Sequence, residues 1–415
     1  MEKSGFNTGL LHGKTSTGYS QREILPPVSQ VTAFAYESME ELEKVFAHKS
    51  MGYAYTRIGN PTLAAFEQKI NELEGGVGAI ACSSGMSAIS CALLALCGSG
   101  DEIIAGRGLY GGSINLFHDL EKLGIHTVYA DVINRENVEK LLSEKTKAVF
   151  GELISNPSLT VMDVAGASEA AHNAGIPLIV DSTTATPYLA RPLSMGADIV
   201  IHSTSKYING GGNAIGGMIV YGGRFNWDFE KHGTLSEFRK YGKMAFLLRL
   251  RTDLWENLGG CMAPANAFLS YIGLDTLGLR MERICSNADK LAHALAEIPG
   301  IEVDYLTLKD HPYHAYVDKE LNGYGGGILN FRAGSKEKAF KIINSLKYAL
   351  IASNIGDIRT LVIHPASTLY IHTGQEEMEA AGVYEDTVRV SVGIEEAEDL
   401  INDFTEAIKN AQAEE

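Results

Sequence analysis

The sequence predicts an α/β protein with a mainly parallel sheet in a large first domain and a smaller α+β domain at the C-terminal end. Short apolar runs between residues 77 and 205 alternate with helical patterns, as is typical of βαβ units whose sheet is buried on both faces. Beyond about residue 255 longer helical stretches dominate. A chain of 415 residues is long enough for two domains.

The chain begins with a segment that carries little core pattern, residues 1–60, which we expect to be an irregular arm that packs on something else. The first helix is predicted in "PTLAAFEQKINELEGG". Asn60 can cap it, Pro61 suits the first helical position, and the Gly75-Gly76 pair can stop it.

The strands of the large domain are predicted at six apolar runs: "VGAIACSS", "DEIIAG", "IHTVYA", "KAVFGEL", "IPLIVDST" and "ADIVIHSTS". In the second domain we expect longer helices, such as "DTLGLRMERICSNADKLAHALAEI" and "SKEKAFKIINSLKYALIASN", and a few strands, such as "TVRVSVGI". The change of pattern divides the chain into a large domain, 61–255, and a small domain, 256–415.

Composition and charge limit the classes of function. No apolar run approaches the roughly 18 residues of a membrane span, and the first residues lack the apolar core of a signal peptide, so we expect a cytoplasmic protein with no membrane partner. A net charge of −16 repels a phosphate backbone, so nucleic acid is not an expected partner. The five cysteines include no C-x-x-C pair, and the histidines show no metal-ligand spacing, so no metal site is expected.

One segment, "HSTSKYINGGG", places a lysine in unusual surroundings. Lys206 ends a predicted strand, is flanked by Ser203 and Ser205, and precedes a run of glycines. Ligands of parallel sheets bind at the carboxyl ends of the strands. A lysine at such an end suits a Schiff base with an aldehyde cofactor. We therefore expect Lys206 to hold pyridoxal 5'-phosphate.

That cofactor makes three further demands. Its ring nitrogen needs a carboxylate partner, and Asp181 follows the apolar run "IPLIV". Its phosphate needs hydroxyls and free backbone N–H groups at a helix N-terminus, which "SSGMSAI" offers between a strand and a helix. Its exposed ring face needs a flat partner, and Tyr110 in "GLYGGS" can stack there.

Two other motifs match patterns of different enzyme classes. Gly76-x-Gly78-x-x-Ala81 matches a dinucleotide fingerprint, but it closes a helix and leads into a strand, which reverses the required context, so we expect a turn. Ser203-x-x-Lys206 matches the S-x-x-K of acyl-serine enzymes, although the S-D-N and K-T-G elements do not occur. A serine acyltransferase or hydrolase is thus the alternative from a different class.

Taken together, these segments resemble the pyridoxal-phosphate enzymes of cysteine and methionine metabolism, a family of cystathionine synthases and lyases, methionine γ-lyase and O-acetylhomoserine sulfhydrylase. The resemblance runs nearly end to end, from "LPPVSQVTAF" to "RVSVGIE", and implies the fold type I architecture of pyridoxal-phosphate-dependent transferases. Its motifs are "YTRIGNPT", "SSGMSAI", "LYGGS", "SNPS", "DSTTATP", "HSTSKYINGGG" and "IHPAST".

The resemblance implies a role for each matching residue. The implied catalytic residues are Lys206, Asp181 and Tyr110, and the implied cofactor-binding residues are Tyr55, Arg57, Gly85, Met86, Tyr110, Asn156, Asp181, Thr183, Ser203, Ser205 and Lys206. Asn354 and Arg389 are the implied substrate-binding residues, with Arg389 as the clamp for the substrate carboxylate. Tyr55 and Arg57 match positions that reach the phosphate of a neighbouring subunit, so the resemblance implies an arm that contacts this neighbour and a homotetramer built as a dimer of dimers.

Departures from the family pattern favour one subfamily. Gly112 stands where methionine γ-lyases usually carry a cysteine, and Ser353-Asn354-Ile355-Gly356 replaces the Glu-Ser-Leu-Gly of cystathionine-handling members. The chain is most similar to the sulfhydrylases. The implied reaction is γ-replacement on O-acetyl-L-homoserine with sulfide or a small thiol, which gives L-homocysteine and acetate. The nearest alternative is γ-elimination of the methionine γ-lyase type, which releases 2-oxobutanoate, ammonia and a thiol.

Overall fold

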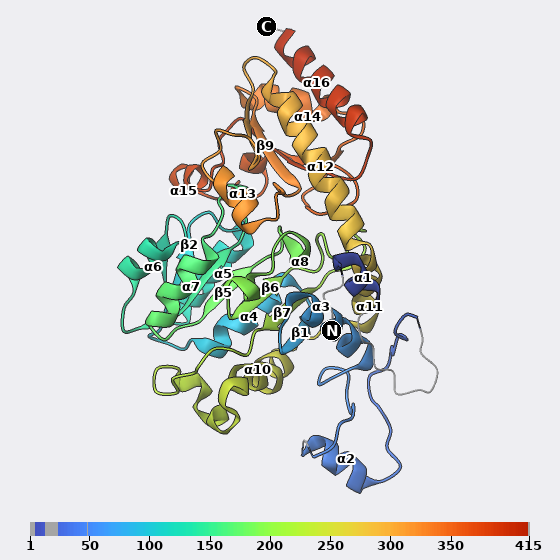
Figure 1. Cartoon of the computed structure of the whole chain (residues 1–415), viewed down its shortest axis with the longest axis vertical. Coiled ribbons are helices and arrows are strands. Elements are labelled where there is room, and N and C mark those ends of the chain that lie inside the picture. Colours follow the sequence, from blue (N-terminus) through green and yellow to red (C-terminus); the bar gives the residue numbers. More distant parts are fainter. Residues whose placement is uncertain (1–4, 13–23, 48, 414–415) are drawn as a thin grey trace.

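The computed structural model describes residues 5–12, 24–47 and 49–413, and it contains two sheets, each with its own covering helices (Figure 1). The larger sheet has seven strands in the spatial order β1-β7-β6-β5-β4-β2-β3. Its strands are β1 (Gly78–Cys82), β2 (Glu102–Gly106), β3 (His126–Ala130), β4 (Thr146–Glu152), β5 (Leu178–Asp181), β6 (Ile199–His202) and β7 (Gly217–Tyr221). The smaller sheet has the order β10-β11-β12-β9-β8, with β8 (Glu302–Asp304), β9 (Ile328–Arg332), β10 (Leu350–Ile351), β11 (Leu361–Ile363) and β12 (Thr387–Ser391).

Sixteen α-helices are found in the described residues: α1 (Phe6–His12), α2 (Met39–Phe46), α3 (Pro61–Glu74), α4 (Gly85–Leu96), α5 (Gly111–Lys122), α6 (Arg135–Leu141), α7 (Val164–Asn173), α8 (Thr186–Leu189), α9 (Pro192–Met195), α10 (Ala245–Arg249), α11 (Pro264–Asp275), α12 (Leu277–Ala296), α13 (His314–Glu320), α14 (Lys336–Ser345), α15 (Gln375–Ala380) and α16 (Ala397–Ala413). Segments of 3₁₀ or π helix lie at Gly233–Met244, Leu250–Trp255 and Pro365–Ser367.

The predicted α/β class and the six predicted strands are confirmed. β2, β3, β4, β5 and β6 run parallel to one another, and all residues of β5 and β6 are buried because helices cover both faces of the sheet. One strand of the larger sheet, β7, was not predicted. β7 lies between β1 and β6 and runs antiparallel to both. The sheet is therefore mainly parallel, with the carboxyl ends of β4, β5 and β6 side by side.

Helix α3 begins and ends where its sequence predicts. The Asn60 side chain accepts a hydrogen bond from the Thr62 amide, Pro61 occupies the first turn, and Gly75 ends the helix in the left-handed conformation with φ 77°. Strand β1 then begins at Gly78. The expected context of the G-x-G-x-x-A match, after a helix and before a strand, is confirmed, although its residues from Gly78 onward belong to β1 and not to a turn.

The C-terminal part differs from its prediction in one helix. The helical stretch expected over residues 335–354 ends at Ser345 in α14, and the chain then enters β10 at the edge of the smaller sheet. Apolar residues after Ser345 form a strand instead of a helix, since Leu350 pairs in parallel with Leu361 of β11. Helix α12 joins the two parts: its residues up to Cys285 belong to the core of the larger sheet, and those from Ala288 onward belong to the second core. The division of domains at residue 255 stays a prediction.

The arm over residues 1–60 contains helices that were not predicted, in the part that the structure describes. Helix α1 packs against α11 and α12, whereas α2 extends away from the body of the chain and buries none of its residues (Figure 1). The Ser38 side chain caps α2 by accepting from the Glu41 amide, so the S-x-x-E capping pattern was present in the sequence. Helix α2 thus has little packing in its own chain: Leu42 and Val45 are only half-buried.

Two further properties concern only the described residues. None of their helices combines the length and apolar character needed to cross a bilayer. No cluster of three or more histidine, cysteine, aspartate or glutamate side chains among them is arranged to hold a metal ion.

Candidate active site

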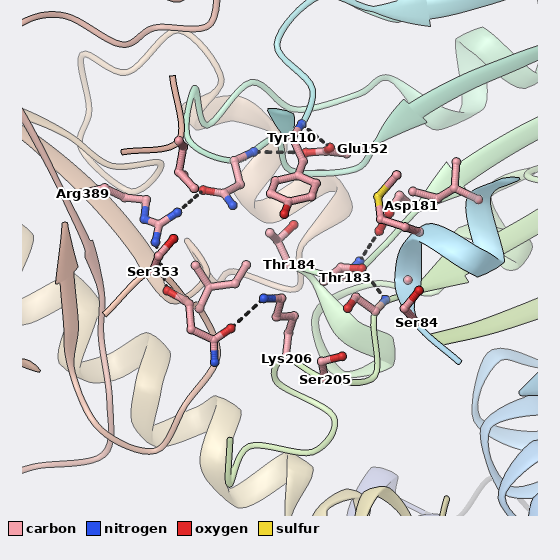
Figure 2. Close-up of a pocket in the computed structure, with 18 residues that line it drawn as sticks. Ser84, Tyr110, Glu152, Asp181, Thr183, Thr184, Ser205, Lys206, Ser353 and Arg389 are labelled. Carbon is pink, nitrogen blue, oxygen red and sulfur yellow. Dashed lines mark hydrogen bonds between the residues drawn. The ribbon is translucent and has the colours of Figure 1, made fainter. Parts of the chain in front are cut away.

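A cavity of about 180 Å³ lies where the carboxyl ends of β4, β5 and β6 face the smaller sheet (Figure 2). Eleven of the thirteen residues predicted to act here line it: Gly85, Met86, Tyr110, Asn156, Asp181, Thr183, Ser203, Ser205, Lys206, Asn354 and Arg389. Segments more than 300 residues apart in the chain meet at this cavity, as the presence of both Gly85 and Arg389 shows. The larger sheet and its helices bring the first nine together, and the chain around the smaller sheet adds the last two.

Lys206 lies just past the end of β6 and points into the cavity (Figure 2). Its Nζ atom donates a hydrogen bond to Oδ1 of Asn354 at 2.6 Å. Burial, followed by repulsion from the Arg389 guanidinium, lowers the pKa of Lys206 from 10.5 to about 8. A lysine with such a pKa is partly unprotonated near neutral pH and can act as a nucleophile or a base.

A tight turn next to Lys206 forms a small polar recess. Ser84 caps α4 by accepting from the Ser87 amide, which leaves the first N–H groups of the helix pointing out of its N-terminus. The helix approaches Ser203 so closely that a Cβ atom on Gly85 would lie 2.7 Å from Cβ of Ser203. Thr183 fixes this approach because its Oγ1 accepts from the Ser203 amide at 2.7 Å. The arrangement suits a phosphate group.

Asp181 lies on the other side of the cavity, at the end of β5, and is only 8% exposed. Its Oδ1 accepts from the Thr183 amide at 2.9 Å, and burial raises its pKa. None of the ion pairs in the described part of the chain includes Asp181. A buried carboxyl group without a basic partner is suited to bind a cation, such as the protonated ring nitrogen of pyridoxal phosphate.

Arg389 on β12 places a buried cation in the same cavity: the residue is only 3% exposed. It donates to Oδ1 of Asn156 at 3.3 Å and to the carbonyl oxygen of Asn354 at 2.9 Å, and its Nε has no hydrogen-bond partner. Burial lowers its pKa to about 10. Neither of its two acceptors is a carboxylate, so the cation can still accommodate an anionic ligand group.

Tyr110 precedes α5, and its ring extends into the cavity between Arg389 and Asp181 (Figure 2). The side chain is 41% exposed, which leaves its ring face available to a flat ligand. Its amide donates to Oε1 of Glu152 at 2.6 Å.

Two predicted residues lie outside the cavity. Arg57 donates to the carbonyl oxygen of Glu256 at 2.8 Å, and its guanidinium lies 5.5 Å from the centre of the Tyr55 ring. Both residues belong to the arm. Their predicted contact is with the phosphate of a neighbouring subunit, and it stays a prediction.

Several residues that line the cavity were not among those predicted: Ser84, Ile89, Glu152, Thr184, Ser353, Ile355 and Leu369. A signal was available for Glu152, because an acidic residue directly follows the apolar run of β4, as Asp181 follows that of β5. No comparable signal marked Leu369, since its segment has no regular pattern.

The chemistry of the cavity fits pyridoxal phosphate. A recess for a phosphate lies at α4, an unpaired buried acid lies at β5, an available lysine lies between them, and an exposed tyrosine faces them. The S-x-x-K alternative requires a lysine that acts on Ser203, whereas the Lys206 amine bonds to Asn354.

Comparisons with known proteins agree with this geometry. The family model described as "Cys/Met metabolism PLP-dependent enzyme" matches residues 7–409. The chain is 38% identical to an O-acetyl-L-homoserine sulfhydrylase of Corynebacterium glutamicum, with 96% of each chain covered, and 36% identical to an L-methionine gamma-lyase of Treponema denticola, with 98% of each covered.

A solved structure of a Campylobacter jejuni protein named as an O-acetylhomoserine (thiol)-lyase has a TM-score of 0.92 and 33% identity, and the match covers 98% of this chain and 100% of that one. It carries an N'-pyridoxyl-lysine-5'-monophosphate. The predicted cofactor and fold type are confirmed by these similarities. The protein is a pyridoxal-phosphate-dependent enzyme, and it belongs to the Cys/Met metabolism family.

Proposed function

We propose that the enzyme replaces the acetoxy group of O-acetyl-L-homoserine by sulfide or a small thiol, which yields L-homocysteine, or the corresponding thioether, and acetate. One observation carries most weight: the same cavity contains an unpaired buried acid at Asp181, an available base at Lys206 and an unpaired buried cation at Arg389. The similarity to proteins named as O-acetyl-L-homoserine sulfhydrylases supports the choice of substrate.

The proposed roles follow from position. Asp181 holds the ring nitrogen of the cofactor, Thr183 lies beside the ring, and Asn156 binds near the ring hydroxyl. Gly85, Met86, Ser203 and Ser205 surround the phosphate, and Arg389 with Asn354 binds the amino-acid carboxylate. The free Nε–H of Arg389 supports the last role, because an anionic ligand would satisfy it.

Bound pyridoxal phosphate supplies an electron sink that stabilises negative charge on the substrate. The Lys206 amine takes the α-proton, which its lowered pKa permits near neutral pH. Arg389 keeps the substrate in place during this transfer. Tyr110 assists proton movement at the leaving group, where the bond between the γ-carbon and the acetate oxygen breaks. The sulfur nucleophile forms the new bond at the same carbon.

The arm supports a proposed assembly. Helix α2 buries no residue in its own chain, and Met39 and Phe46 are 71% and 59% exposed. We propose that this helix packs on a neighbouring subunit, that Tyr55 and Arg57 reach the neighbour's cofactor phosphate, and that the enzyme is a homotetramer. We also propose a cytoplasmic location, which the five free cysteines support because a reducing compartment keeps thiols unpaired.

The first experiment incubates the purified, cofactor-loaded enzyme with O-acetyl-L-homoserine, with and without sulfide, and measures homocysteine and 2-oxobutanoate together. Homocysteine that requires sulfide, with little keto acid, is the expected result. Keto acid formed at a similar rate with or without sulfide would instead establish γ-elimination, the second candidate, which the 36% identity to an L-methionine gamma-lyase supports. Pre-treatment with an acylating agent is a control for the serine mechanism.

A further inference from the structure

Glu152 at the end of β4 holds two backbone amides at once. One carboxylate oxygen accepts from the Tyr110 amide at 2.6 Å and the other from the Asn156 amide at 3.2 Å (Figure 2). Tyr110 precedes α5 at the cap position and makes no side-chain cap, so the Glu152 carboxyl group accepts at this helix N-terminus from the neighbouring strand, where a negative charge is favoured. Charge-assisted hydrogen bonds of this kind are stronger than neutral ones.

The two amides belong to residues that line the cavity, and one of them, Asn156, bonds to Arg389, the proposed clamp for the amino-acid carboxylate. Beyond Asn156 the hydrogen bonds continue, because its Oδ1 accepts from Arg389 and Arg389 donates to the carbonyl oxygen of Asn354. The Asn354 side chain in turn accepts from Lys206. One carboxylate thus connects the tyrosine on one side of the cavity with the arginine and lysine on the other.

Glu152 also has an acidic neighbour. It is the register partner of Asp181 on the adjacent parallel strand, so the two carboxyl groups lie side by side. Burial, and after it the charge of Asp181, raises the pKa of Glu152. None of the ion pairs found among the described residues includes either carboxyl group. A cation bound at Asp181 therefore makes it easier for Glu152 to carry its charge.

We propose that Glu152 is a positioning residue that fixes Tyr110 and Asn156 at the substrate end of the cavity, and that a cationic cofactor ring beside Asp181 strengthens this hold. Loading of the cofactor then orders the groups that receive the amino acid. The proposal rests on the proposed roles of Tyr110 and Arg389, but its test does not require the proposed reaction.

The test variant is Glu152→Gln, which has one acceptor oxygen for two amides and no negative charge. The matched control is Glu320→Gln, because Glu320 is also a buried acid, 7% exposed, and it lies on α13, where it pairs with Lys319 rather than lining the cavity. Both variants and the unaltered enzyme are measured by hydrogen–deuterium exchange, with and without bound cofactor, in the peptides that contain Tyr110 and Asn156.

In the unaltered enzyme and in Glu320→Gln, cofactor should slow exchange in both peptides. In cofactor-loaded Glu152→Gln, both peptides should exchange about tenfold faster than in the unaltered enzyme, as expected for loss of a hydrogen bond to a charged group. The difference in exchange between the loaded and the cofactor-free form should also be smaller than in the unaltered enzyme. The KM for O-acetyl-L-homoserine should rise more than kcat falls, while cofactor absorbance stays. Unchanged exchange in both peptides overturns the proposal, as does a cofactor effect equal to that of the unaltered enzyme.

A second variant, Glu152→Asp, tests the proposal if Glu152→Gln does not fold. Glu152→Asp retains the charge but shortens the side chain by one methylene group, so it should protect one of the two peptides and release the other. Protection of both to the original level overturns the proposal. If exchange behaves as expected while the enzyme makes no homocysteine, the positioning role holds and the proposed reaction fails.

Discussion

Replacement of Lys206 by methionine should stabilise the cofactor-free protein at pH 7, although it removes the proposed catalytic base. The charged amine is costly in its buried position, since its pKa falls from 10.5 to about 8. Each pKa unit corresponds to about 1.36 kcal/mol, so at pH 7 the lysine lowers the free energy of unfolding by about 3 kcal/mol. Methionine has a similar length and no charge, and it loses only the hydrogen bond to Asn354, about 1 kcal/mol.

The sign of the pH dependence gives the sharper test. The pKa of Lys206 is lower in the folded than in the unfolded protein, so the unfolded protein binds more protons between about pH 8 and pH 10.5, and the penalty disappears as the pH rises through that window. At pH 9.5 the penalty has fallen to about 1 kcal/mol. The difference in free energy of unfolding between the methionine variant and the original protein should therefore decrease by about 2 kcal/mol from pH 7 to pH 9.5.

The measurement is urea unfolding of cofactor-free protein at both pH values, followed by circular dichroism. Lys140→Met is the matched control, because Lys140 is an exposed residue of α6 and its replacement should change stability by less than about 0.5 kcal/mol at either pH. An equal stability difference at the two pH values, or a variant less stable than the original at pH 7, would refute the reasoning.

Three further outcomes are expected in the loaded enzyme. Lys206→Ala should abolish turnover, and homocysteine formation at the original rate would contradict the proposed role. Arg389→Lys should lower kcat/KM roughly 10- to 100-fold, mostly through KM, because lysine keeps the charge but loses the fork of donors; an unchanged KM would remove Arg389 from the carboxylate site. Gly85→Ala should speed cofactor loss on dialysis, since its Cβ would lie 2.7 Å from Cβ of Ser203, while Gly233→Ala, whose Cβ would meet nothing within 4 Å, should retain the cofactor as the original does.

Local patterns were sufficient to predict most elements of the larger sheet. Apolar runs of strand length and the caps of α3 are properties of neighbouring residues, so they are visible in the sequence. The edge strand β10 was mistaken for helix because its apolar residues continue the pattern of α14, and only pairing with β11 decides their conformation. β7 was missed for a related reason, since insertion between β1 and β6 depends on distant partners.

The sequence by itself determined the fold class, the cofactor and eleven of the residues that line the cavity, because these depend on residue types at strand ends and on motifs that keep their order along the chain. The tertiary structure alone revealed that Glu152 lies beside Asp181 and holds the amides of Tyr110 and Asn156. It also revealed that Lys206 bonds to Asn354, which is 148 residues away along the chain. Such contacts, and the pKa values that follow from burial, arise from distances between segments that only the folded chain brings together.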